Sequence, residues 1–222
     1  MKIKQYIKLK IGGINMFNCR GEKCREEKVK EYEIIPLSHS KLLIGQQKKS
    51  CTGDILTDSY YLFEYKKKID PSDTGGFYCG SHAAKHFLQL INHPGLPLFN
   101  PLSQLGVTNA QTVSSYSSVK KKWDPKAKEL YDAINLLIIC WDTPIYGALA
   151  KIKAGLEKFP DKEPFDKKIL FVNNVIKKDA RKRVLTQMLN DLRNLNPSLR
   201  QFTFNQLNAV LNSKNVDSYF EK

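Results

Sequence analysis

The sequence predicts an α+β protein with a β-rich N-terminal module and a mostly helical C-terminal half. Short aliphatic and aromatic runs between residues 31 and 68 are bounded by turn residues, which is typical of strands. From residue 126 onward, apolar residues recur with helical spacing. A stretch rich in Pro, Ser, Thr and Asn separates these patterns, so we expect a module at 1–92, an irregular connector at 93–125 and a mainly helical part at 126–222.

The N-terminal module is predicted to contain strands followed by one helix. Residues 1–11 alternate between lysines and apolar residues, which predicts a half-buried strand. Further strands are predicted at 32–35, 41–44 and 60–65. The composition of 70–76 is typical of a loop. Ser81 is a suitable N-cap for a helix that extends to Asn92, because the residues that follow it form an apolar stripe.

The C-terminal half is predicted to contain several amphipathic helices. Residues 168–175 fit either a strand or a helix, since their periodicity does not decide between the two. The clearest apolar stripe predicts a helix from Lys177 to Leu195. Further helices are predicted from Asp124 to near Trp141, from Thr143 onward, and over 203–212.

The charge balance predicts a polyanionic partner. The chain has 36 Lys and Arg against 22 Asp and Glu, for a formal net charge of +14. Such an excess favours nucleic acid first and an anionic membrane surface second. No stretch approaches the roughly 18 apolar residues of a membrane span, and no secretory signal pattern is present. We therefore expect an intracellular protein, cytoplasmic or in the nucleus or nucleoid.

Cysteine and histidine spacing predicts a structural zinc site. The chain has five cysteines, and in a reducing compartment paired cysteines indicate a metal or catalytic site before a disulfide. Cys19 and Cys24 flank a glycine-containing turn, while Cys79 and His82 lie at the start of the helix predicted at 81–92. Together these four side chains supply the sulfur and nitrogen ligands of a tetrahedral structural Zn2+.

This order of a cysteine pair, a β-rich segment and a ligand-bearing helix resembles the treble-clef zinc-binding proteins over residues 16–92. The resemblance implies that Zn2+ anchors the helix to the module. Cys51 is an alternative to either upstream cysteine, and His86 lies one turn after His82. Cys79, His82 and His86 could instead form a three-ligand catalytic site with an open position.

Clusters of cations predict where nucleic acid would bind. The most concentrated one consists of Lys177, Lys178, Arg181, Lys182 and Arg183. A second consists of Lys120, Lys121 and Lys122 beside Trp123, and a weaker third of Lys66, Lys67 and Lys68 near tyrosines. A charge run alone is more often a solvated face, but cations at the start of the predicted helix 177–195 oppose its dipole, which favours a partner. Lysines contact phosphates without reading sequence, so the pattern fits DNA and RNA equally.

Two enzymatic functions are alternatives to a binding protein. Pro160-Asp161 followed by Asp166 and Lys168 resembles a nuclease motif in which carboxylates hold Mg2+. Cys79 lies at a predicted helix start, where the dipole favours a thiolate nucleophile. Its base would be a histidine; His82 and His86 are too near in sequence to be the usual partner, but His39 could approach in space. We favour a zinc-stabilised basic protein that binds nucleic acid through its lysine-rich patches.

Overall fold

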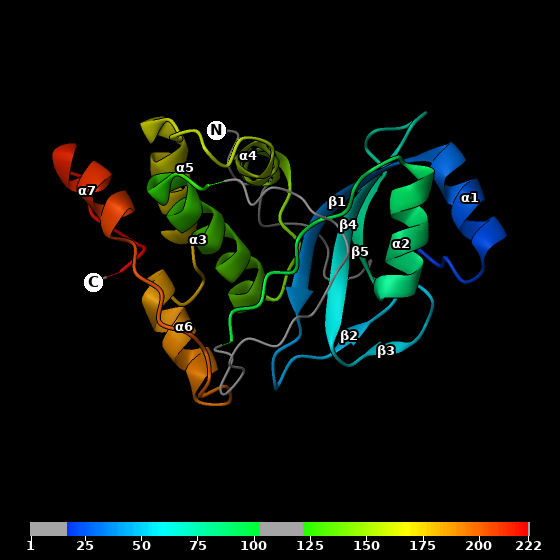
Figure 1. The fold of residues 1–222 in the computed structure, drawn as a ribbon, viewed down its shortest axis with the longest axis horizontal. Helices are drawn as coiled ribbons and strands as arrows, with labels where there is room; N and C mark the ends of the chain where they lie inside the picture. Colours follow the sequence, from blue (N-terminus) through cyan, green and yellow to red (C-terminus); the bar gives the residue numbers. More distant parts are fainter. Residues whose placement is uncertain (1–16, 103–121, 222) are drawn as a thin grey trace. The chain divides into compact units, whose positions relative to one another are not determined.

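The protein is described by a computed structural model that covers residues 17–102 and 122–221. The predicted strand at 1–11 and much of the predicted connector lie outside these ranges. The chain divides into two compact units: unit 1 comprises Met1–Asn100 with Pro144–Tyr146, and unit 2 comprises Pro101–Thr143 with Gly147–Lys222. The α+β class is confirmed, because the described strands all belong to unit 1 and most helices to unit 2 (Figure 1).

Unit 1 is built on an antiparallel sheet. Its described elements are α1 (Glu22–Glu31), β1 (Tyr32–Lys41), β2 (Lys48–Lys49), β3 (Ile55–Leu56), β4 (Ser59–Lys67), β5 (Thr74–Cys79) and α2 (Ser81–Leu90). The three longer strands pair in the order β1-β4-β5, and β2 pairs with β3 in a separate ribbon. Phe63 of β4 lies opposite Phe77 of β5, which places both rings on one face of the sheet.

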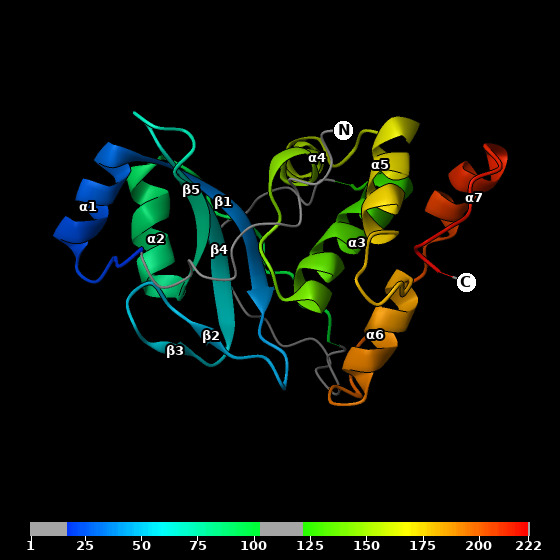
Figure 2. The same cartoon turned by 180° about the vertical axis from the view of Figure 1, so that it is seen from behind.

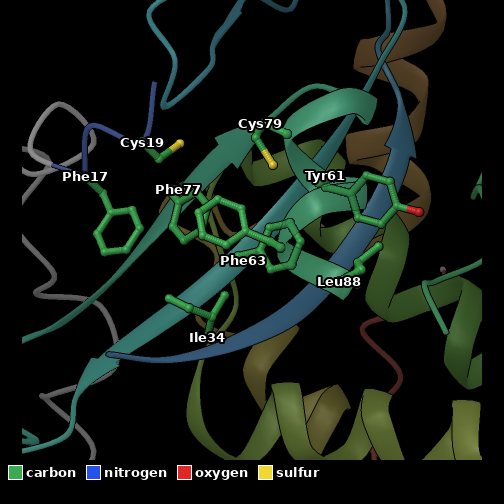
Figure 3. Packing of buried hydrophobic residues seen from close by; sticks show 11 residues of the cluster. Phe17, Cys19, Ile34, Tyr61, Phe63, Phe77, Cys79 and Leu88 are labelled. Atoms are coloured by element: carbon green, nitrogen blue, oxygen red, sulfur yellow. The ribbon is translucent and has the colours of Figure 1, made fainter. Parts of the chain in front are cut away.

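That face packs against α2 through a buried aromatic cluster. Figure 3 shows Phe63 and Phe77 side by side on this face. The ring of Phe87 lies 5.8 Å from that of Phe63 and 5.2 Å from that of Phe77, and all three residues are buried. Each such ring removes roughly 150–250 Å² of surface from water. The alternating aromatic residues of β4 thus form the centre of the unit 1 core, together with Ile34 from β1.

The strands predicted for unit 1 agree with the structure more closely in their positions than in their ends. The strands predicted at 32–35 and 60–65 lie within β1 and β4. The strand predicted at 41–44 is wrong, because β1 ends at Lys41 and the next amide, that of Leu42, bonds to the carbonyl of Asp58. Helix α1 was not predicted, and β5 begins within the predicted loop 70–76.

Unit 2 is a helical unit built around α3. Its described helices are α3 (Pro125–Trp141), α4 (Gly147–Lys158), α5 (Asp166–Ile176), α6 (Leu185–Arg193) and α7 (Asn205–Ser213). Asp124 caps α3 by accepting a 2.9 Å hydrogen bond from the amide of Ala127, and Pro125 occupies its first turn. α3 packs against α4, α5, α6 and α7, which explains why it is apolar on nearly every side (Figure 2). Within residues 17–102 and 122–221, each helix is too short or too polar to cross a bilayer.

The helix predicted from Lys177 to Leu195 is wrong in its first half. α5 continues to Ile176, residues 177–184 form a connection, and α6 begins only at Leu185. The segment 168–175, which periodicity left undecided, is helical as part of α5. The basic cluster therefore follows the C-terminus of one helix, where cations are favourable for the dipole.

Candidate nucleic-acid interface

The strongest predicted cation cluster forms a compact connection between α5 and α6, which we call the basic loop (residues 177–183). Its first amides continue the hydrogen bonding of α5: those of Lys177, Lys178 and Asp179 donate to carbonyls of the last helical turn at 3.0, 3.1 and 2.9 Å. The amide of Lys182 then donates to the carbonyl of Asp179 at 2.9 Å, and Lys182 adopts a φ of 55°. The loop is therefore ordered by its own backbone.

The carboxylate of Asp179 lies at the centre of the basic loop. Its side chain is only 2% exposed and accepts hydrogen bonds from Trp141 Nε1 at 2.9 Å and from Arg183 Nη2 at 3.0 Å. Two loop amides, those of Arg181 and Arg183, also donate to it at 3.0 and 3.1 Å. Burial alone would raise the pKa of Asp179, but the hydrogen bonds from Arg183 and Trp141 hold it well below its usual range. The carboxylate is thus ionised and fully used inside the unit.

This arrangement sorts the predicted binding residues into two groups. Arg183 faces inward, where it also pairs with Asp191 at 2.7 Å. The other four cations are exposed, and none forms an ion pair with a carboxylate of the described residues. These outward cations are Lys177, Lys178, Arg181 and Lys182. The only acid of the run is turned inward, so the outer side of the loop carries positive charge alone.

Of the other two cation clusters, the structure describes one in full, and its lysines are partly engaged. Lys120 and Lys121 lie outside the described residues, and Lys122 is exposed. Lys66 lies 3.5 Å from Glu64, Lys67 lies 4.0 Å from Asp73, and Lys68 donates to the carbonyl of Val29. The three lysines line a hollow of about 340 Å³ together with Glu33 and Pro71. The tyrosines predicted to stack on bases there, Tyr60, Tyr61 and Tyr65, are buried or half-buried.

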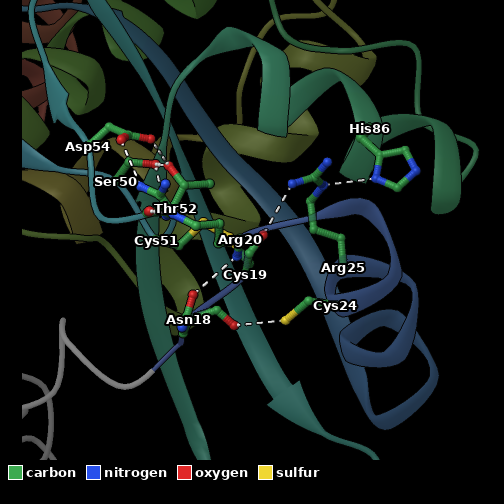
Figure 4. Close-up of a disulfide and its surroundings, with 10 residues drawn as sticks. All are labelled: Asn18, Cys19, Arg20, Cys24, Arg25, Ser50, Cys51, Thr52, Asp54 and His86. Carbon is green, nitrogen blue, oxygen red and sulfur yellow. Dashed lines mark hydrogen bonds and ion pairs between the residues drawn. A yellow bond between two sulfur atoms is a disulfide. The ribbon is translucent and has the colours of Figure 1, made fainter.

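The predicted zinc ligands are not brought together. Cys19 forms a disulfide with Cys51, with their Cα atoms 5.4 Å apart, so its sulfur is not a free thiolate (Figure 4). The thiol of Cys24 donates to the carbonyl of Asn18 at 3.3 Å. Cys79 is fully buried, and His82 is exposed on α2. No group of three or more His, Cys, Asp or Glu side chains in the described ranges could hold a metal ion. The zinc site therefore stays a prediction without geometric support.

Hydrogen bonds of polar side chains around the disulfide join α1 to α2. The buried guanidinium of Arg25 donates from Nη1 to the carbonyl of Cys19 at 3.1 Å and from Nε to Nδ1 of His86 at 2.8 Å (Figure 4). Arg20 donates to the carbonyl of Thr52 at 2.7 Å and pairs with Asp54 at 2.8 Å. His86 is thus engaged in holding the fold rather than directed at a metal or a thiol.

The residues of the two enzymatic alternatives are likewise engaged elsewhere. Burial raises the pKa of the Cys79 thiol well above its usual range, which opposes the predicted thiolate. Asp161 lies 3.4 Å from Lys162, and Asp166 lies 2.9 Å from Lys214. Both ion pairs are solvent-exposed, and neither carboxylate belongs to a group of three or more metal-ligating side chains within the described ranges.

Comparison with known proteins identifies a family but no characterised relative. Neither a curated protein nor a solved structure matches the chain. One family model, described as Uncharacterised conserved protein UCP028583, matches residues 17–219. This range includes the disulfide, both described units and the basic loop. The match covers most of the chain, which therefore belongs to this family.

Proposed function

We propose that the protein binds nucleic acid through the outward cations of the basic loop. The observation that carries the proposal is the inward turn of Asp179, which leaves Lys177, Lys178, Arg181 and Lys182 exposed and without a carboxylate partner among the described residues. A net charge of +14 adds long-range attraction. Such contacts neutralise phosphates and release counterions, so binding should be strongly salt-dependent and should tolerate many sequences.

The magnitude of the salt effect follows from the number of outward cations. Each phosphate contact on duplex DNA contributes about 0.9 to the slope of log affinity against log salt. Four contacts account for a slope of about 3.6, or about a 150-fold loss of affinity between about 50 and 200 mM salt. Single strands have a slope of about 0.7 per contact.

The test compares two sets of charge-neutralising substitutions by fluorescence anisotropy with labelled DNA and RNA. The loop variant changes the four outward cations to Gln. The control variant makes the same change in charge on exposed lysines of unit 1: Lys23, Lys30, Lys49 and Lys85. The loop variant should lose affinity and about 3.6 of the duplex slope, and the control should change little. Equal losses in both variants, or no salt-dependent binding by the wild type, would overturn the proposal.

An intracellular location is consistent with a nucleic-acid partner, and it stays a prediction. A disulfide such as Cys19–Cys51 persists mainly in oxidising environments, so the oxidation state of the protein in its cell bears directly on this expectation. No contact in the described residues favours the nuclease or the thiol enzyme over binding, and we propose neither.

A further inference from the structure

Two phenylalanines are exposed on the connection between α4 and α5. Phe159 and Phe165 are 52% and 69% exposed, whereas most large apolar residues of unit 2 are buried. The prolines that follow or precede them, Pro160 and Pro164, are buried. The amide of Phe159 also closes α4 by donating to the carbonyl of Gly155 at 3.1 Å. The connection thus anchors itself through its prolines and presents its two rings to solvent.

Lysine ammonium groups lie over both rings. Lys158 Nζ is 5.3 Å from the ring centroid of Phe159, while Lys167 and Lys168 lie 5.5 and 5.7 Å from that of Phe165. Lys168 Nζ also lies 4.0 Å from the position that a Cβ on Gly155 would take, one turn before Phe159. The end of α4 and the start of α5 therefore present one surface, the Phe–Lys patch, defined by Lys158, Phe159, Phe165, Lys167 and Lys168.

The acids of this connection are neutralised by other lysines. Asp161 pairs with Lys162 at 3.4 Å, and Asp166 pairs with Lys214 at 2.9 Å. Glu163 pairs with Lys126. The three lysines of the Phe–Lys patch, by contrast, form no ion pair with a carboxylate in the described parts of the chain. The patch therefore complements a ligand that combines flat apolar rings with negative charge.

We propose that the Phe–Lys patch stacks on the unpaired bases of a single-stranded nucleic acid. Every base has an apolar face, so stacking on Phe159 and Phe165 tolerates any sequence, while the surrounding ammonium groups contact phosphates. The inference rests on the proposed function and specifies its ligand. α5 connects the patch to the basic loop at its other end (Figure 2), and its 11 residues span about 16 Å.

The test measures binding of an unstructured single-stranded oligonucleotide and of a duplex to three variants. The pair Phe159→Ala and Phe165→Ala should weaken single-strand binding by about five- to 150-fold for each ring that stacks, with less than about a twofold change for the duplex. The pair Phe159→Leu and Phe165→Leu keeps apolar surface but removes the aromatic faces, and should also weaken single-strand binding. Leu195→Ala removes an unrelated exposed side chain of the same unit and should have no effect.

Three outcomes would overturn this inference. Unchanged single-strand binding by the alanine pair, or equal losses for single strand and duplex, would exclude base stacking. The third outcome is that the wild type sediments with phosphatidylserine vesicles and the leucine pair still does so. This result would assign the two exposed rings to membrane insertion instead. Failure of the proposed function is distinct, since it would appear as no salt-dependent binding of the wild type to any nucleic acid.

Discussion

Removing the Cys19–Cys51 disulfide should destabilise unit 1 substantially. The bond joins residues separated by 32 positions in sequence. Closing a loop of that length lowers the entropy of the unfolded chain, and the chain-entropy relation gives a stabilisation of about 3.7 kcal/mol at 25 °C. With a urea m-value of about 1.5 kcal/mol/M, the midpoint of unfolding should fall by roughly 2.5 M on reduction.

Urea titrations followed by circular dichroism, with and without a dithiol reductant, measure this shift. The double variant Cys19→Ser and Cys51→Ser should reproduce the reduced midpoint and should not respond to reductant. Cys24→Ser is the matched control, because Cys24 is a free cysteine outside the bond. It should leave the midpoint almost unchanged, whereas the predicted zinc site would make Cys24 as important as Cys19.

Thiol counting in denaturant provides the decisive result. The structure leaves Cys24, Cys79 and Cys140 free, so three thiols should react before reduction and all five cysteines after it. Five reactive thiols before reduction, combined with no effect of reductant on the urea midpoint, would refute the disulfide. If a chelator were needed to expose those thiols, the zinc prediction would be supported instead.

Further predictions concern two titratable groups, Asp179 and His39. Asp179→Asn should destabilise unit 2 by about 3–5 kcal/mol, because it leaves Arg183 without its buried partner. Asp191→Asn, at a 55% exposed side chain, should cost only about 0–1 kcal/mol. Urea midpoints from tryptophan fluorescence, which comes from Trp123 and Trp141 of unit 2, measure both. The pKa of Asp179 is lowered in the folded state, so its ionised carboxylate stabilises unit 2 above pH 3.8, and this stabilisation is lost as the pH falls further. The urea midpoint should therefore fall more steeply with decreasing pH in the wild type than in Asp179→Asn. Burial lowers the pKa of His39, although its hydrogen bond to the carbonyl of Leu96 and the charge of Asp58 act in the opposite direction. The stability of the wild type should therefore decline as the pH falls below 6.5, and that of His39→Gln should decline less. Urea midpoints measured from pH 8 to 5 would show this difference.

The fold class was predictable because the two periodicities are strong. The aromatic alternation of β4 and the apolar stripe of α3 each reflect burial, which sequence patterns record directly. Helix α1 escaped prediction because Arg25 is its only buried residue and it carries almost no apolar stripe. It is held instead by contacts from distant residues, including the bond from Arg25 to His86.

The first three residues of strand β5 were predicted as part of a loop because two of them are glycines. A Cβ on Gly75 would stand 2.6 Å from the hydroxyl of Tyr65, and one on Gly76 would stand 2.6 Å from that of Tyr146. The glycines therefore allow side chains to approach the strand closely, a requirement that only the folded chain reveals. Sequence composition cannot distinguish this use of glycine from a turn.

The basic loop shows that a run of charges in the sequence does not reveal which side chains face inward and which face solvent. The sequence identified the cations of 177–183 but could not separate the inward Arg183 from the outward cations, which include another arginine, Arg181. A signal was present, since Asp179 precedes Arg183 by four residues. The disulfide left no such signal, because five cysteines allow many pairings and the compartment inferred from the sequence argued against any of them.

Asp179→Asn also distinguishes two possible sources of nucleic-acid affinity: the ordered conformation of the basic loop, and the net charge of the whole protein. The substitution removes one negative charge and raises the formal net charge from +14 to +15. If affinity depends on net charge alone, the variant should bind DNA and RNA more tightly than the wild type. If affinity depends on the orientation of the outward cations, it should bind more weakly, because the loop amides of Arg181 and Arg183 lose a charged acceptor. The two cases give opposite signs in anisotropy titrations at a temperature where tryptophan fluorescence shows the variant to be folded. Tighter binding by the folded variant would refute the role assigned to the loop.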